Sequence, residues 1–358
     1  MIKYIGSKRV LVPLIGELAQ SLAPAGTFVD LFSGTSRVGH AMKERGYRVL
    51  ANDLNSYAYT LARCYVEADR EHLLTRAEDM IAELNRLPGE PGYFTKTFCE
   101  DSRFFQPKNG ARIDAMRTWV QGHALEADLE AVLLVSIMEA ADRVDSTTGV
   151  QMAYLKQWAP RAHNDIALRV PALLVQASSG KGRAYQLDAR DAATKLSGDI
   201  GYLDPPYNQH SYLGNYHIWE TLVRWDAPEP YGIARKRSDC RERQSDFNGK
   251  RKIKDAVSEV INALDVRHLI VSFNNEGYIS KDEMLEMLSA RGEVSVVERD
   301  FKRYVGAQIG IYSPAGEKVG VISHLKNKEF VFVVSTPRSA PARRLPTRGA
   351  LAIVAKSA

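Results

Sequence analysis

The chain has 358 residues, 45% of them hydrophobic and 25% charged, and its 48 basic and 43 acidic residues give a net charge of +5. This length predicts about two domains, and the composition excludes a wholly disordered or fibrous chain. No apolar run reaches the roughly 18 residues of a membrane span, and the first eight residues lack the apolar core of a secretory signal. Cys64, Cys99 and Cys240 fit neither a zinc motif nor a disulfide framework, so we expect a cytoplasmic protein without a metal site. The mild positive charge permits nucleic acid as a partner but does not require it.

The first clear pattern along the chain is a strand, a turn, a helix and a second strand. The predicted elements are a strand over 27–32, a small-residue turn over 33–36, a helix over 37–45 and a strand over 47–51. This order predicts a βαβ unit with two parallel strands.

The pattern then becomes helical and stays so as far as about residue 178. Helices are predicted over 57–67, 71–86, 111–123 and 125–141. Because no clear strand returns within this stretch, we interpret it as a helical domain inserted into the sheet.

Strand patterns resume in the last third of the chain. Strands are predicted over 183–187, 200–203 and 268–273, a helix over 281–290, and an antiparallel pair over 293–301 and 329–335. We therefore expect the cofactor half of a catalytic domain at 1–60, a helical insertion at 61–178, and the catalytic half at 179–336 with a basic insertion at 208–255. Residues 337–358 contain basic residues and proline but no acid, which predicts a disordered tail.

The turn after the first strand has the features of a nucleotide pocket. Gly34 lets the backbone approach a ligand, and Asp53 follows 19 positions later at the end of the second strand, where a carboxylate receives ribose hydroxyls. The turn lacks the G-x-G-x-x-G glycines, and Asp30 places an anion at its mouth, so a phosphate ligand is disfavoured. The cationic S-adenosylmethionine fits better. The alternative is that Gly34 and Gly39 are ordinary turn and packing glycines.

The sequence Asp204-Pro205-Pro206-Tyr207 directly follows a predicted strand. Two prolines cannot continue a central strand, so they form a rigid exit at the sheet edge where ligands of α/β folds bind. Asp204 and the Pro205 carbonyl could accept both hydrogens of an exocyclic amino group, and Tyr207 could stack on an extruded base. The alternative is a plain surface turn.

Together these motifs resemble the Dam-type, alpha-group family of DNA adenine-N6 methyltransferases. Its motifs appear in the family's order at residues 3–8 (KYIGSK), 30–34 (DLFSG), 53 and 204–207, within a resemblance over roughly 1–60 and 180–336. Residues 139–144 and 147–150 resemble a subset of the family. The resemblance implies an α/β fold, an S-adenosylmethionine-dependent, Rossmann-like methyltransferase sheet with an inserted helical target-recognition domain.

The resemblance also implies roles for individual residues. An acidic residue near the adenine ring of the cofactor could be Asp188 or Asp191, and the spacing of 16 to Asp204 favours Asp188. The implied catalytic residues are Asp204, Pro205, Pro206 and Tyr207. The implied cofactor-binding residues are Tyr4, Lys8, Asp30, Phe32, Ser33, Gly34, Asp53 and Asp188.

The basic insertion offers candidate contacts to DNA. Residues 235–254 contain nine basic and three acidic residues, which suits a track along phosphates, with residues 247–249 at the tip of a loop. The predicted contacts are Lys236, Arg237, Lys250, Arg251 and Lys252. The alternative is a solvated charged loop. Tyr212, Tyr216, Trp219 and Leu222 are better interpreted as the packing face of a helix than as base-stacking platforms.

We therefore predict methyl transfer from S-adenosylmethionine to a flipped adenine within a short sequence of double-stranded DNA. The alternatives are cytosine-N4 methylation and a catalytically inactive DNA-binding subunit. Cytosine-C5 methylation is excluded because none of the three cysteines follows a proline. A cognate restriction endonuclease is an open possibility as a partner, and we expect a monomer or a weak dimer.

Overall fold

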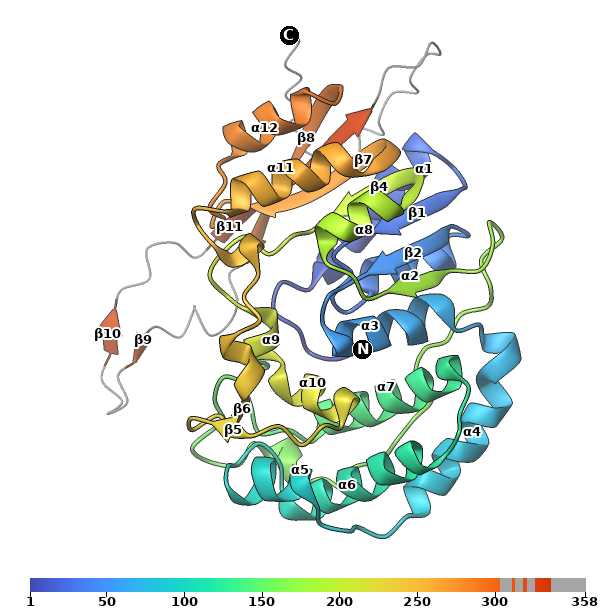
Figure 1. The fold of residues 1–358 in the computed structure, drawn as a ribbon, viewed down its shortest axis with the longest axis vertical. Helices are drawn as coiled ribbons and strands as arrows, with labels where there is room; N and C mark the ends of the chain where they lie inside the picture. The colour runs from blue at the N-terminus through green and yellow to red at the C-terminus, as the bar shows by residue number, and fades with distance from the viewer. Residues whose placement is uncertain (303–310, 313–317, 321–325, 336–358) are drawn as a thin grey trace.

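The centre of the computed structural model is a seven-stranded sheet with the order β3-β2-β1-β4-β7-β11-β8 (Figure 1). The structure describes residues 1–302, 311–312, 318–320 and 326–335. The sheet confirms the predicted α/β fold of an S-adenosylmethionine-dependent methyltransferase. The predicted tail at 337–358 lies outside the described residues.

Five neighbouring strands of the sheet are parallel, and they end at the same edge. They are β1 (Thr27–Asp30), β2 (Arg48–Asn52), β3 (Arg183–Tyr185), β4 (Ser197–Leu203) and β7 (Asp265–Asn274). The other two are β8 (Glu293–Lys302) and β11 (Lys326–Ser335), and β11 lies antiparallel between β7 and β8. The predicted antiparallel pairing of 293–301 with 329–335 is therefore correct. Because ligands of parallel sheets bind beyond the carboxyl ends of the strands, this edge is where a site is expected.

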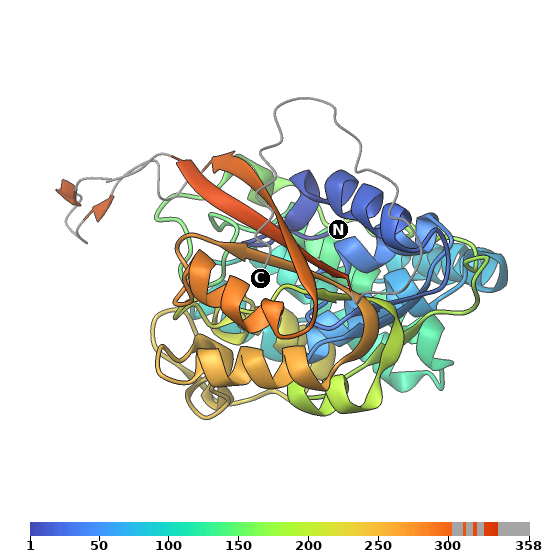
Figure 2. The ribbon, with the colours of Figure 1, turned by 90° about the horizontal axis from the view of Figure 1, so that it is seen from above.

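Helices cover both faces of the sheet, because neighbouring residues of a buried strand point to opposite sides. Phe28 packs on one face with α2 (Arg37–Glu44) and with α1 (Val12–Leu22), which follows the short 3-10 helix η1 (Lys8–Val10). Its neighbour Val29 belongs to the opposite core, with α8 (Ala189–Lys195), α11 (Ile253–Ala263) and α12 (Lys281–Ser289). Figure 2 shows blue α1 on one side of the sheet and the green-to-orange α8, α11 and α12 on the other.

A separate helical body lies beyond the β2–β3 edge (Figure 1). Its elements are α3 (Ser56–Ala62), the π-helix η2 (Arg63–Glu67), α4 (Arg70–Arg86), α5 (Tyr93–Thr95), the π-helix η3 (Lys96–Glu100), α6 (Pro107–Gly122), α7 (Ala127–Arg143) and the short η4 (Pro160–His163). The segment predicted as one helix over 57–67 is α3 continued by a π-helix. A helix from much later in the chain, α10 (His217–Arg224), inserts Ile218, Trp219 and Leu222 into the same core.

The basic insertion is built from short elements. They are α9 (Tyr212–Asn215), β5 (Pro230–Tyr231), β6 (Lys236–Arg237), and the 3-10 helices η5 (Ser238–Arg241) and η6 (Asp246–Asn248). A further two-stranded ribbon pairs β9 (Ile311–Tyr312) with β10 (Lys318–Gly320). In the part of the chain that the structure describes, no helix is both long and apolar enough to cross a membrane.

Candidate active site

A cavity of about 360 Å³ opens at the carboxyl ends of β1, β2 and β4. It brings together ten of the twelve residues predicted for the cofactor and for catalysis, from segments far apart in the sequence. These residues are Tyr4, Lys8, Asp30, Phe32, Ser33, Gly34, Asp53, Asp188, Asp204 and Pro206. The other two, Pro205 and Tyr207, are chain neighbours of Asp204 and Pro206 but do not line the cavity.

The turn after β1 forms one wall and requires glycine at position 34. Gly34 has φ of +50°, in the left-handed region, and a Cβ there would lie 3.4 Å from Cε1 of Tyr4. That distance is ordinary van der Waals contact, so it is the left-handed backbone conformation that favours glycine here. The Ser33 amide donates to the Asn52 carbonyl at 2.9 Å, which fixes this turn to the end of β2.

Asp53 is held rigidly at the base of the cavity. Its carboxylate accepts hydrogen bonds from the amides of Gly34 and Asn55, each at 3.0 Å, and from the Asn55 side chain at 3.2 Å. Burial raises the pKa of Asp53 to about 6, although these donors oppose the shift. A fixed acceptor at the end of β2 suits the ribose hydroxyls of a nucleoside.

Asp30 is a buried carboxylate with an unused acceptor atom. Oδ2 accepts from the Gly39 amide at 3.2 Å, whereas Oδ1 has no hydrogen-bond partner among the described residues. Burial raises the pKa of Asp30 to about 8, and the nearby charge of Asp204 adds to the shift. A cationic ligand would lower this raised pKa and favour the ionised carboxylate, whereas a phosphate would oppose ionisation. The free oxygen therefore fits a cationic ligand and disfavours a phosphate.

Asn52 also belongs to this site, although no sequence pattern predicted a role for it. Its Nδ2 donates to the carbonyls of Leu31 and Leu187 at 3.2 Å, and its Oδ1 accepts from the Leu187 amide at 3.0 Å. One buried amide side chain thus ties together the loops that follow β1, β2 and β3. The only sequence feature that could have indicated this role is the position of Asn52 directly before Asp53, at the end of β2.

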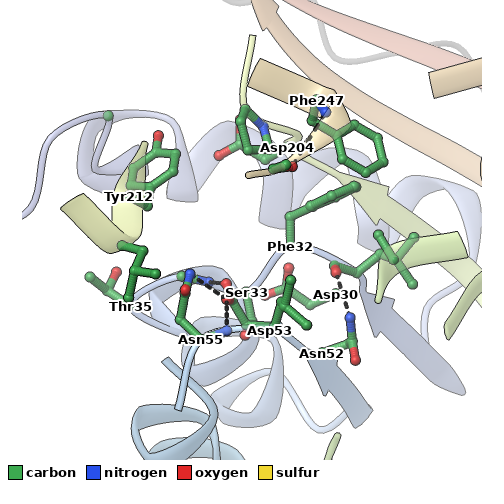
Figure 3. A pocket seen from close by; sticks show the side chains of 18 of the residues that line it. Asp30, Phe32, Ser33, Thr35, Asn52, Asp53, Asn55, Asp204, Tyr212 and Phe247 are labelled. Carbon is green, nitrogen blue, oxygen red and sulfur yellow. Dashed lines mark hydrogen bonds between the residues drawn. The ribbon is translucent and has the colours of Figure 1, made fainter. Parts of the chain in front are cut away.

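Two aromatic rings from distant segments form one side of the cavity (Figure 3). Phe32 and Phe247 meet edge to face, with ring centroids 5.0 Å apart. Phe247, predicted with residues 248 and 249 to lie at the tip of a loop, is instead 4% exposed and part of η6. Its ring is buried because η6 packs against α11 and the sheet.

Asp188 lies at the N-terminus of α8, where its Oδ1 accepts from the Arg190 amide at 2.9 Å. It lines the cavity, whereas Asp191 is exposed and does not. The structure thus places Asp188, and not Asp191, where a ligand could be reached.

Tyrosines form the opposite side, where Figure 3 shows Tyr212 facing the phenylalanine pair. Tyr4 stacks on Tyr212 with centroids 5.2 Å apart and on Tyr216 at 4.5 Å. Tyr216, Trp219 and Leu222 are buried, so the predicted packing face is confirmed for them. Tyr212 packs on Tyr4 as well, but it also lines the cavity.

Asp204 follows β4 and forms an ion pair with Lys8. The Lys8 Nζ lies 3.1 Å from Oδ1 of Asp204 and 3.6 Å from Oε2 of Glu329, on β11. Burial raises the pKa of Asp204, and Lys8 opposes this shift. Lys8, predicted to touch the cofactor, thus lies against the catalytic motif, and no sequence signal indicated Glu329. Tyr207 is fixed by an edge-on contact with Phe273 at 5.7 Å, and burial raises its pKa to about 12.

The basic insertion divides into internal and exposed cations. Arg237 is 2% exposed and donates to both oxygens of Asp226 at 2.7 Å and to Asp239 at 3.0 Å. The prediction that Arg237 contacts DNA is therefore wrong, because its guanidinium is already paired inside the fold.

The other predicted DNA contacts differ in exposure. Lys250 and Arg251 are exposed, and Lys252 is exposed but pairs with Asp246 at 2.9 Å. Lys236 is half-buried beside Gly214 of α9, next to the cavity wall. Among the described residues, no cluster of three or more His, Cys, Asp or Glu side chains could hold a metal ion.

Comparison with known proteins gives a consistent result. The family model of D12 class N6 adenine-specific DNA methyltransferases matches residues 4–287. Type II methyltransferase M.NlaIII of Neisseria lactamica is 31% identical over 84% of this chain and 92% of its own length. Type II methyltransferase M.FokI of Planomicrobium okeanokoites is 32% identical over 81% of this chain but only 47% of its own length. Type II methyltransferase M.CviAII of Paramecium bursaria Chlorella virus 1 is 27% identical over 85% and 92%.

Proposed function

The chain belongs to the D12 class of N6 adenine-specific DNA methyltransferases, and from that premise we propose which residues carry the reaction. It transfers the methyl group of S-adenosylmethionine to the amino nitrogen of adenine in DNA, so the cytosine-N4 alternative is set aside. When bound, S-adenosylmethionine supplies a methyl group activated by its sulfonium. The protein then has to bind the cation, present the amino nitrogen and exclude water.

The residues of the cavity fit this cofactor. The free Oδ1 of Asp30 offers a buried anionic acceptor to the cationic part of the ligand. Asp53 is positioned for ribose hydroxyls, and Asp188 lies at the same edge of the cavity for the adenine ring. Phe32 and Phe247 provide apolar surface for that ring, beside the turn formed by Ser33 and Gly34.

Asp204 and Pro205 would act on the target base. The adenine amino nitrogen is a poor nucleophile because its lone pair is shared with the ring. Two acceptors, the Asp204 carboxylate and the Pro205 carbonyl, can bind its two hydrogens and stabilise the positive charge that develops as the methyl group arrives. Pro206 stiffens this turn, and Tyr207 would stack on the flipped base. The single observation that carries this assignment is the position of Asp204 on the rim of the cavity that holds Asp30 and Asp53.

The DNA would follow the exposed cations of the insertion. We propose phosphate contacts for Lys250, Arg251 and Lys252, and a further contact for Lys236, which lies beside Gly214 of α9. The relatives are named type II methyltransferases, which supports a role beside a cognate restriction endonuclease in the cytoplasm.

The experiment that tests the catalytic assignment is Asp204→Ala. Loss of the acceptor should lower the rate of methyl transfer at least about 1000-fold, of the order seen when a transition-state donor or acceptor is removed. Transfer of tritiated methyl groups to unmethylated genomic DNA measures the rate, and calorimetry measures cofactor affinity, which should change little. The matched control is Asp191→Ala, an exposed carboxylate outside the cavity. An Asp204→Ala enzyme with unchanged turnover would refute the assignment.

A further inference from the structure

Three charged side chains from three parts of the chain meet behind the catalytic turn. Lys8 comes from η1, Asp204 follows β4, and Glu329 lies on β11; we call them the Lys8 cluster. Their side chains are only 7%, 19% and 9% exposed, respectively. One ammonium therefore lies between two buried carboxylates, and the cluster carries a net charge of −1.

Glu329 is an unusual residue for its position. It pairs in register with Asn274 on β7, and the residues that follow it on β11, Phe330 and Val331, are buried and apolar. Its Oε2 has no hydrogen-bond partner among the described residues and faces Lys8 at 3.6 Å. Burying such a carboxylate costs desolvation energy that one loose ion pair and a hydrogen bond with the Asn274 side chain offset incompletely, so an apolar residue would serve stability better. A use in the site next to it would explain its presence.

The ion pair of Lys8 with Asp204 has two opposite effects. Lys8 favours the ionised form of Asp204. The reaction needs this form because a carboxylate both accepts hydrogen bonds from the amino group and stabilises the positive charge that develops on it. An ammonium fully committed to Asp204 would, however, weaken that carboxylate as an acceptor for the adenine amino group. A second carboxylate on the other side of the ammonium balances these effects.

We propose that Glu329 is a positioning residue that holds Lys8 between two carboxylates, so that Lys8 keeps Asp204 ionised without weakening it as an acceptor. The inference rests on the proposed role of Asp204. Glu329 itself does not line the cavity, so it acts through Lys8.

The sign of the electrostatic effect is fixed by the groups around the cluster. The titratable groups that interact with its members are Tyr202, Tyr207, Tyr212 and Asp30. Burial raises the pKa of Asp204 and Lys8 lowers it, while burial and the charge of Asp204 raise the pKa of Glu329. Since that repulsion is mutual, removal of the Glu329 charge lowers the pKa of Asp204, and removal of the Lys8 charge raises it.

The test compares Glu329→Gln, Glu329→Asp and Lys8→Met by single-turnover methylation of unmethylated genomic DNA between pH 5 and 9. For Glu329→Gln we expect the plateau rate to fall about tenfold, equivalent to about 1.4 kcal/mol. The acidic limb of its pH–rate profile should lie at lower pH than that of the parent enzyme. Glu329→Asp keeps the charge and should restore most of the rate. Lys8→Met should move the limb to higher pH, and adding Glu329→Gln to it should slow the enzyme no further.

Controls separate this idea from a structural effect. Glu298→Gln, on the neighbouring strand β8, removes a carboxylate that pairs with Lys281 at 2.6 Å away from the site, and it should leave both rate and limb unchanged. Urea denaturation verifies that each variant is folded. A Glu329→Gln enzyme with the wild-type rate, or with a slower rate but an unmoved limb, overturns the proposal, as do additive effects with Lys8→Met. If Asp204→Ala retains activity, the catalytic assignment fails instead.

Discussion

The cofactor cavity and the basic insertion use their charges in opposite ways. In the cavity, Asp30 is buried and one of its oxygens is left without a partner in the described structure. In the insertion, Arg237 is buried and its guanidinium is paired with Asp226 and Asp239. An unsatisfied buried charge indicates a ligand, whereas a satisfied one indicates a structural role. The density of charge in a sequence cannot tell these cases apart.

Removal of the Arg237 side chain should have the largest effect on stability. Arg237→Ala removes the buried guanidinium that pairs with Asp226 and Asp239 and leaves them only the exposed Arg224 as a common partner. Breaking a partly buried ion network of this kind costs about 3 kcal/mol. Urea denaturation should show this loss, while Lys250→Ala should leave the midpoint unchanged. An Arg237→Ala protein as stable as the parent would place Arg237 among the DNA-contacting cations after all.

The second prediction concerns the pH dependence of stability that Asp30 creates. Burial raises its pKa from 3.8 to about 8, so the folded protein binds this proton more tightly than the unfolded chain. The stabilisation is complete at acidic pH and is lost as pH rises towards 8. Asp30→Asn removes this loss, so the variant should gain on the order of 4 kcal/mol over the parent between pH 5 and pH 8.

The same variant should bind the cofactor about 100-fold more weakly, because the buried anion that faces a cationic ligand is gone. Urea denaturation at several pH values and calorimetric titration with S-adenosylmethionine check the two parts. The control is Asp191→Asn, which is exposed and should alter neither. A stability gain without loss of affinity would mean that Asp30 does not contact the cofactor.

What could be predicted from the sequence is what local patterns encode. The βαβ unit was correct because β1, α2 and β2 follow one another with short connections, and Asp30, Gly34 and Asp53 all lie within it. Phe247 and Glu329 were missed because each acquires its role from a partner that is more than a hundred residues away in the chain, Phe32 and Lys8. No periodicity or spacing encodes such a contact.

The same limit explains the error at Arg237. Lys236, Arg237 and Lys250 look equivalent in the sequence, since all belong to one basic run. Only the fold brings Asp226 and Asp239 to the guanidinium of Arg237 and leaves Lys250 exposed. Which cation is available to DNA is therefore a property of the tertiary structure.

The smallest expected effect, and the sharpest test of this division, is on the salt dependence of DNA binding. Lys250→Ala/Arg251→Ala removes two exposed cations, so the slope of log affinity against log salt concentration should become shallower by about two. Stability should not change, because among the described residues neither side chain forms an ion pair. The control Arg86→Ala/Lys195→Ala removes the same charge from exposed positions on α4 and α8. Fluorescence anisotropy with a DNA duplex at roughly 50 to 200 mM salt measures the slopes of the two double variants. Equal slopes for the two double variants would mean that net charge alone, and not the exposed end of the insertion, attracts the DNA.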